Sequence, residues 1–205
     1  MTLASTESID QALRHLRRSD PVMKGLIRQV GPFTLKLQRN RFRSLARAII
    51  AQQISTAAAR SIQRRLEEQL APEPLSAAAI SQLSLDELRS SGISPQKGSY
   101  LIDLAEKVQA GTVPLNRIGR LSDEAVIEQL TQVKGIGRWT AQMFLIFSLG
   151  RLDVFPHDDL GIRSAIKRLY QLPDLPNKQT SQQIAAPWTP YASVASWYCW
   201  RSLEL

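Results

Sequence analysis

The sequence predicts an all-α protein, and three observations support this class. Apolar residues recur at helical spacing along nearly the whole length of the 205-residue chain. Capping patterns stand before several of these stretches: Ser84 precedes Glu87 by three residues, and Ser122 stands before two acidic residues. Only Thr34 to Gln38 alternates as a strand would, and one short strand makes no sheet. We therefore expect about ten helices, many of them short.

The expected helices follow one another along the chain. The apolar positions that define the first of them are Ile9, Leu13 and Leu16, then Leu45, Ala48, Ile49 and Ile50, then Ile62 and Leu66, then Leu101, Leu104, Ala105 and Val108. Two further patterns, Asp123 to Gln132 and Gly137 to Leu149, are separated by a short turn. Another pattern runs from Leu160 to Tyr170, and Pro187 and Pro190 mark a break before the last helix.

The charge balance points to a polyanionic partner. The chain holds 26 Lys and Arg against 18 Asp and Glu, a net charge of +8. Thirteen of the basic residues lie between Gln11 and Arg65, where Asp20 is the one acid. A solvated helix surface is the alternative interpretation, because the sequence does not show which of these side chains point the same way. Apolar residues make up 43% and charged residues 21%, which excludes a disordered chain.

Two sequence features bear on the cellular compartment. Cys199 is the one cysteine, so it forms no internal disulfide and holds no thiolate zinc site or iron-sulfur cluster. No stretch of about 18 consecutive apolar residues occurs, and the N-terminus lacks the apolar core of an export signal. We expect a cytoplasmic protein in reducing surroundings, with no membrane partner.

The turn Val133 to Gly137 is a candidate phosphate-binding element. Gly135 and Gly137 permit a positive φ and a close backbone approach, while Ile136 anchors the turn in the core. Backbone N–H groups at the start of the following helix point outward and bind an anion without reading a base. A plain turn is the alternative, because a lone Gly-x-Gly is a weak signal. Asp158 and Asp159 precede the next helix. We expect one of them to cap it and the other to face a pocket.

These motifs together resemble a known family. The segment VKGIGRWTA with Asp159 further on, the segment Leu45 to Ser55 that ends in Gln-Gln-Ile-Ser, and the aromatic segment Trp188 to Trp200 stand in the family's order. They are similar to the helix-hairpin-helix DNA glycosylase superfamily, and specifically to its alkylation-repair branch, the 3-methyladenine DNA glycosylase II type. The resemblance extends over most of the chain and implies the compact form of the family, without an appended α/β domain.

The resemblance implies two helical lobes with a cleft between them. Residues 1–40 and 151–205 would form the terminal lobe. Residues 41–150 would form the central lobe, with the helix-hairpin-helix at about residues 121–149. Asp159 takes the place of the catalytic carboxylate, which leaves Asp158 to cap or orient. No cofactor is required.

Further site residues follow from the same resemblance. The base-pocket residues are Trp139, Trp200, Met143 and Gln53. The DNA-contacting residues are Gly135, Ile136, Gly137, Arg138, Thr140, Ser55 and Lys134. The wedge that fills the vacated stack is Ile93, Pro95 or Gln96. Backbone carbonyls of Thr131, Val133 and Ile136 correspond to those that hold a structural Na⁺ or K⁺ beside a DNA phosphate.

Trp139 separates two branches of this family. Relatives that cut the strand after removing an oxidised base have a nucleophilic lysine at this position, and an indole does not replace it. An electron-rich ring instead attracts a cationic alkylated purine by about 0.5–2 kcal/mol. A core residue is the alternative role for Trp139. Trp188 and Trp197 are expected to pack in the core, Tyr198 is left open, and Met143 replaces the tyrosine of some relatives.

The sequence therefore predicts a monofunctional DNA glycosylase of base excision repair. It would flip alkylated purines out of double-stranded DNA and hydrolyse their N-glycosidic bonds, with 3-methyladenine, 7-methylguanine and ethenoadenine as candidate bases. Such an enzyme would act as a monomer associated with the nucleoid. Two alternatives stay open: a non-catalytic helix-hairpin-helix DNA-binding protein and a bifunctional oxidised-base glycosylase/lyase.

Overall fold

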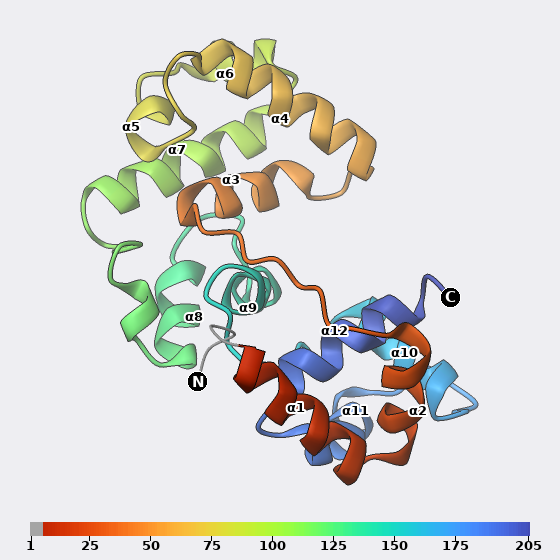
Figure 1. Cartoon of the computed structure of the whole chain (residues 1–205). Coiled ribbons are helices and arrows are strands. Elements are labelled where there is room, and N and C mark those ends of the chain that lie inside the picture. The colour runs from red at the N-terminus through yellow and green to blue at the C-terminus, as the bar shows by residue number, and fades with distance from the viewer. Residues whose placement is uncertain (1–5) are drawn as a thin grey trace. The chain divides into compact units, whose positions relative to one another are not determined.

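The computed structural model describes residues 6–205. Over this range the chain forms twelve α-helices and two short 3-10 helices, and no β-strand (Figure 1). The predicted all-α class is confirmed, with more helices than the expected ten or so. The strand-like segment Thr34 to Gln38 lies in a stretch with neither helix nor strand. None of the helices in this range is long and apolar enough to cross a membrane.

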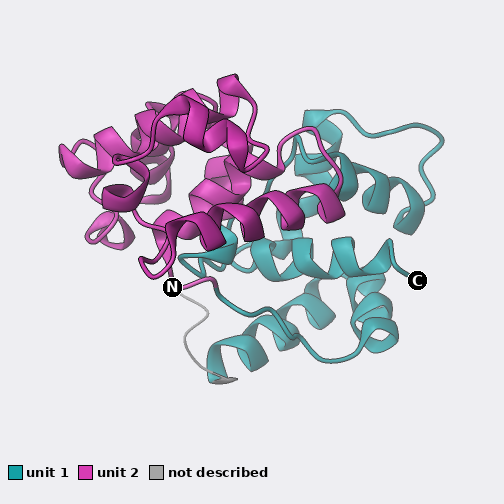
Figure 2. Cartoon of the chain, turned by 90° about the horizontal axis from the view of Figure 1, so that it is seen from above, with its two compact units in different colours: residues 1–37, 145–205 teal, residues 38–144 magenta. Residues whose placement is uncertain are grey.

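The chain divides into two units (Figure 2). Unit 1 comprises residues 1–37 and 145–205, and unit 2 comprises residues 38–144. The helix α9 (Arg138–Phe147) begins in unit 2, and its last three residues belong to unit 1.

Unit 1 is built around the last helix of the chain. Its elements are α1 (Thr6–Ser19), α2 (Pro21–Val30), α10 (Leu160–Leu169), α11 (Lys178–Ala185), the 3-10 helix η2 (Ala186–Trp188) and α12 (Ala192–Ser202). α12 packs against α10, α2 and α1. Most of its side chains are buried, as expected of a helix that is covered on all sides. Trp188 and Trp197 lie in this core, as predicted, and so does Tyr198.

Two helices of unit 1, α2 and α11, were absent from the periodic stretches recognised in the sequence. Asp20 caps α2 by accepting the backbone N–H groups of Val22 and Met23, at 2.8 and 3.1 Å. Pro21 occupies the first turn, where its missing N–H costs nothing. An Asp-Pro pair before an apolar run was therefore a readable helix start.

Unit 2 is centred on α7 (Pro95–Gln109), which packs against three other helices of this unit. The remaining elements are α3 (Arg41–Ala51), α4 (Thr56–Leu70), α5 (Ala77–Ile80), α6 (Leu85–Ser90), the 3-10 helix η1 (Ile118–Arg120) and α8 (Asp123–Thr131). The predicted caps are confirmed. Ser84 and Glu87 form a reciprocal capping box on α6, and Ser122 caps α8.

Candidate active site and DNA interface

Asp159 is the N-cap of α10 in unit 1. Its Oδ1 accepts the backbone N–H of Ile162 at 2.8 Å and the indole N–H of Trp200 at 2.9 Å. The residue is 9% exposed. Of the two roles expected for Asp158, to cap or to orient, capping is therefore wrong, because the carboxylate three residues before the Ile162 amide is that of Asp159. The side chain of Asp158 is 70% exposed and lies 2.9 Å from Nδ1 of His157.

Trp200 contacts the candidate catalytic carboxylate directly. Its half-buried ring also lies against Phe147, with ring centroids 5.5 Å apart and an interplanar angle of 32°. Gly161 lies close to the side chains of both Asp159 and Trp200. A Cβ added there would lie 3.1 Å from Oδ1 of Asp159 and 3.2 Å from Cδ1 of Trp200. No local pattern in the sequence indicates the roles of Gly161 and Phe147, since each role depends on how distant segments pack.

The turn between α8 and α9 needs one of its two glycines. Gly135 has φ +79°, and a Cβ on it would lie 2.1 Å from Cδ2 of Tyr100. Gly137 has an ordinary φ, and an added Cβ would meet nothing within 4 Å. Gly135 thus adopts the positive φ that a glycine permits, and Gly137 does not. Ile136 is buried and anchors the turn, as predicted.

Two side chains that the sequence analysis did not assign brace this turn. Oδ2 of Asp103 accepts the backbone N–H of Lys134 at 2.9 Å. The side-chain amide of Gln52 donates to the carbonyl of Gly135 at 2.8 Å. The Lys134 side chain itself extends into solvent, with its Nζ 4.0 Å from Asp103.

The first turn of α9 presents candidate DNA-contacting side chains. Trp139 is 47% exposed, so the alternative role of a buried core residue is wrong. Arg138 pairs with Glu124 on α8, with Nη1 3.0 Å from Oε2, and this hydrogen bond lowers the pKa of Glu124. Thr140 is buried and Met143 is half-buried. The ion pair therefore joins the two helices of the hairpin at their outer surface.

The segment after α3 lies beside the turn. Gln53 is exposed and has φ +57°, a backbone conformation that side chains other than glycine seldom adopt. Ser55 accepts the N–H of Ala58 at 3.2 Å and caps α4. The ammonium of Lys97 donates to the carbonyls of Ile50 and Gln52, at 2.8 and 2.6 Å.

The wedge candidates differ in exposure. Ile93 is 2% exposed, so this prediction is wrong, because its apolar side chain belongs to the core of unit 2. Pro95 and Gln96 are exposed in the first turn of α7. Nε2 of Gln96 donates to the hydroxyl of Tyr100 at 2.7 Å.

Part of the basic cluster has a structural role. Glu67 forms hydrogen bonds with Arg43, at 2.7 and 2.9 Å, and with Arg47 at 3.1 Å, and these bonds lower its pKa against the opposing effect of burial. Arg65 donates to the carbonyl of Ser91 at 2.9 Å. Arg41 reaches the carbonyls of Leu115 and Asn116. At least four of the thirteen basic side chains thus stabilise unit 2 itself.

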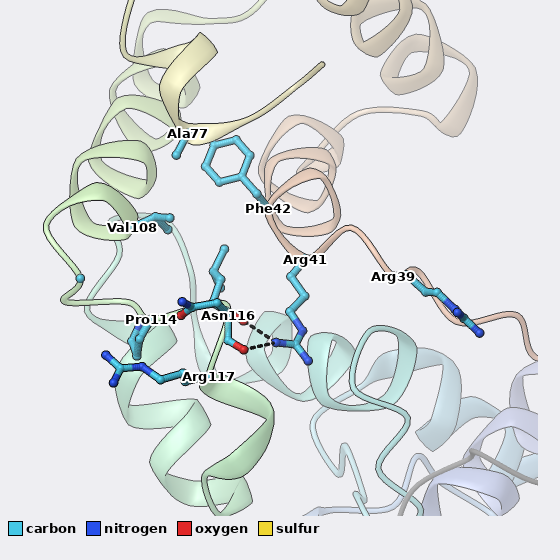
Figure 3. Close-up of a pocket in the computed structure, with 10 residues that line it drawn as sticks. Arg39, Arg41, Phe42, Ala77, Val108, Pro114, Asn116 and Arg117 are labelled. Carbon is cyan, nitrogen blue, oxygen red and sulfur yellow. Dashed lines mark hydrogen bonds between the residues drawn. The ribbon is translucent and has the colours of Figure 1, made fainter. Parts of the chain in front are cut away.

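A cavity of about 580 Å³ lies at the start of α3 (Figure 3). Arg41 lies beside it, and Arg39 and Arg117 lie toward opposite edges with their guanidinium groups pointing away from each other. Phe42 and Val108 contribute apolar surface. The lining contains none of the residues predicted for chemistry or base recognition, so the cavity is separate from the candidate site.

The helical fold, the braced glycine turn and the fixed carboxylate define a base excision DNA repair protein. Residues 46–190 match the HhH-GPD superfamily of base excision DNA repair proteins, and the chain belongs to this family. Its fold is the helix-hairpin-helix glycosylase fold, as predicted from the resemblance.

Relatives similar over nearly the whole chain are known. DNA-3-methyladenine glycosylase 1 of Schizosaccharomyces pombe is 35% identical, over 97% of this chain and 89% of its own. A solved structure of the S. pombe 3-methyladenine DNA glycosylase Mag1 with abasic DNA has a TM-score of 0.85 and 34% identity, covering 95% of this chain and 97% of that one. A DNA-3-methyladenine glycosidase of Bacillus halodurans has a TM-score of 0.86 and 31% identity, covering 98% and 91%.

Proposed function

We propose that this protein is a monofunctional DNA glycosylase that hydrolyses the N-glycosidic bond of alkylated purines in duplex DNA. The observation that carries the proposal is the Asp159 carboxylate, held in place by the first turn of α10 and by the indole of Trp200. The names of the S. pombe and B. halodurans relatives support 3-methyladenine as a substrate. We include 7-methylguanine and ethenoadenine as candidate bases.

Asp159 acts on the sugar of the damaged nucleotide. As the base leaves with the electrons of the glycosidic bond, positive charge develops at C1′ and O4′ of the sugar. A carboxylate fixed before the reaction stabilises that charge without having to reorient. Water then adds to C1′ and loses a proton, which gives an abasic site and the free base. A purine alkylated at N3 or N7 is already cationic and leaves without being protonated.

Binding and recognition use residues of unit 2. The backbone N–H groups at the start of α9 bind a DNA phosphate, while Lys134 adds positive charge. The damaged nucleotide rotates out of the stack, at an unstacking cost of a few kcal/mol. The exposed ring of Trp139 offers its face to a cationic base, and Pro95 or Gln96 fills the space that the base vacates.

The turn also offers oxygen ligands for a monovalent cation. The carbonyl of Val133 accepts the N–H of Ile136 at 3.1 Å and retains a second lone pair. Within residues 6–205 no backbone N–H donates to the carbonyls of Thr131 and Ile136. Carbonyl oxygens suit Na⁺ and K⁺, whose charge would strengthen the phosphate contact. Replacing these ions by a bulky organic cation at equal ionic strength should then weaken duplex binding.

Adjacent aspartates provide the decisive experiment. We expect Asp159→Asn to slow release of 3-methyladenine from methylated duplex DNA on the order of 100-fold or more, with duplex affinity retained. Asp158→Asn is the matched control and should release base at the wild-type rate, because its side chain points into solvent. Full activity of Asp159→Asn would overturn the assignment. The released bases are identified by chromatography on a panel of lesion-containing duplexes.

The two alternative functions predict different outcomes. A non-catalytic DNA-binding protein would bind duplex DNA without releasing a base. A glycosylase/lyase would form a covalent DNA adduct that borohydride traps, and Trp139 in place of the lysine argues that no adduct forms. We also propose that the protein works as a monomer on nucleoid DNA in the cytoplasm, since every step above needs one chain.

A further inference from the structure

One face of α7 contacts two parts of unit 2 that are assigned to DNA binding, the glycine turn and the segment at the end of α3. Lys97, Tyr100 and Asp103 are spaced three residues apart, so their side chains lie along one side of the helix. The family resemblance assigns no role to Tyr100 or Asp103, and it places Lys97 at the end of the wedge segment without naming it as a wedge. Each of the three side chains makes a different set of contacts.

Asp103 holds the entry to the turn. Its carboxylate is largely buried and accepts the backbone N–H of Lys134. Lys107, one helical turn further along α7, pairs with the other oxygen at 2.5 Å. Burial alone would raise the pKa of Asp103, but the hydrogen bonds from Lys107 and Lys134 outweigh it and lower the pKa. The carboxylate therefore supports the turn while Lys107 neutralises its charge next to the phosphate site.

Tyr100 holds the apex of the turn. Its ring occupies the place where Gly135 would carry a side chain, and its hydroxyl accepts a hydrogen bond from Gln96. Gln96, one of the two exposed wedge candidates, and the phosphate-binding turn thus contact the same tyrosine.

Lys97 links α7 to the end of α3. Partial burial of its ammonium lowers the pKa of that group, which donates to the carbonyls of Ile50 and Gln52 at the end of α3. The side chain of Gln52 in turn donates to the carbonyl of Gly135. The strained Gln53 therefore follows a residue that is fixed at both its backbone and its side chain.

We propose that Lys97, Tyr100 and Asp103 are positioning residues that keep the turn, the Gln52 to Ser55 segment and Gln96 in one preformed arrangement for DNA. The inference rests on the proposed function of the turn. Fixing these segments before binding reduces the ordering entropy that the complex would otherwise lose. The three residues touch no reacting atom, so they should affect DNA affinity and leave the chemical step unchanged.

Asp103→Ala tests the proposal, with Glu106→Ala as the matched control. Glu106 lies on α7 and is exposed, so its removal changes the net charge by the same amount. For Asp103→Ala we expect the Kd for an abasic-site duplex and the KM for a methylated duplex to rise about tenfold. Glu106→Ala should leave both unchanged or slightly lower. The base-release rate at saturating enzyme should stay within about twofold of wild type for both variants.

A second readout separates positioning from loss of folding. Amide hydrogen exchange of Lys134 to Gly137 should speed up in Asp103→Ala while the core amides of unit 2 keep their protection. Tyr100→Phe removes only the hydroxyl contact with Gln96, and it should fold normally and still raise KM. Asp103→Asn, which retains an acceptor for the Lys134 N–H, should restore most of the affinity.

The outcomes distinguish this inference from the proposed function. Unchanged Kd and KM in both Asp103→Ala and Tyr100→Phe would overturn the positioning role, even if Asp159→Asn abolishes base release. A fall in the saturating rate with KM unchanged would also overturn it. Base release that survives Asp159→Asn would overturn the glycosylase assignment, while the Kd measurements would still test the positioning role as a property of DNA binding.

Discussion

Trp200 and Ile162 donate hydrogen bonds to the same oxygen of Asp159, from the indole N–H at 2.9 Å and the backbone N–H at 2.8 Å. The two donors come from different helices, α12 and α10. Because the two donors come from two helices, they hold Oδ1 in a fixed position relative to both of them. Trp200 is therefore a positioning residue for the candidate catalytic group, a role beyond the aromatic face that its residue type suggests.

Trp200→Phe should slow base release at saturating enzyme about tenfold or more, because a hydrogen bond to a charged group is lost while an aromatic ring remains against Phe147. Single-turnover release of 3-methyladenine measures the effect. Trp197→Phe serves as the control. That ring packs against Phe33 in the core, so its substitution should lower the melting temperature and leave the release rate unchanged.

Gly161→Ala should also slow base release, because the new methyl group would press on both Asp159 and Trp200. The substitution lies inside α10, where alanine is otherwise favoured by about 0.5–1 kcal/mol, so the melting temperature should change little. Gly25→Ala in α2 is the control, because it measures the stability gained when alanine replaces a helical glycine without a clash. Nothing lies within 4 Å of its added Cβ, and we expect it to raise stability without affecting activity. Normal release by Gly161→Ala would contradict the tight packing around the carboxylate.

Local patterns in the sequence predicted the features that depend on residues close together in the chain. The caps at Ser84 and Ser122 were readable because each side chain bonds a backbone N–H three residues later. Ile136 was recognised as the anchor of the turn by its position between two glycines.

Features that depend on packing between segments far apart in the chain could not be predicted from the sequence. Trp200 lies 41 residues from Asp159, so no local signal indicates their hydrogen bond. The contact between Tyr100 and Gly135 also joins segments that are far apart in the chain. It explains why Gly135, and not Gly137, has no room for a side chain. Ile93 follows a glycine in a short connection and resembles an exposed loop residue, yet its side chain is taken up by the core.

The two glycines of the turn should respond differently to alanine. Gly135→Ala introduces both an unfavourable positive φ and a clash with the Tyr100 ring, so duplex affinity should fall more than about tenfold and the protein should be destabilised by about 1–3 kcal/mol. Gly137→Ala should fold as wild type, because its φ is ordinary and the space beside it is open. Fluorescence titration with duplex DNA and thermal unfolding test this pair. Equal effects would contradict the geometry of the turn.

Glu67 should make stability depend on pH. Its pKa is lowered in the folded protein by hydrogen bonds from Arg43 and Arg47. The contribution to the free energy of unfolding is therefore complete above the ordinary pKa of 4.5 and is lost as the pH falls through the lowered value. Thermal unfolding of wild type and Glu67→Gln should differ near neutral pH and converge in acid. Glu68→Gln, an exposed neighbour 3.8 Å from Arg64, should show a smaller difference throughout.

Asp20→Ala should destabilise unit 1 by about 3 kcal/mol or more. The largely buried Asp20 caps α2 and also accepts the indole N–H of Trp188 at 2.9 Å and the hydroxyl of Tyr170. Alanine would leave the buried Trp188 donor and the half-buried Tyr170 donor without their acceptor and would remove the cap. Chemical denaturation followed by tryptophan fluorescence measures the loss, with Asp10→Ala on the exposed face of α1 as the control for charge. A similar small effect for both variants would show that water replaces the Asp20 acceptor, because only then would the buried donors remain satisfied.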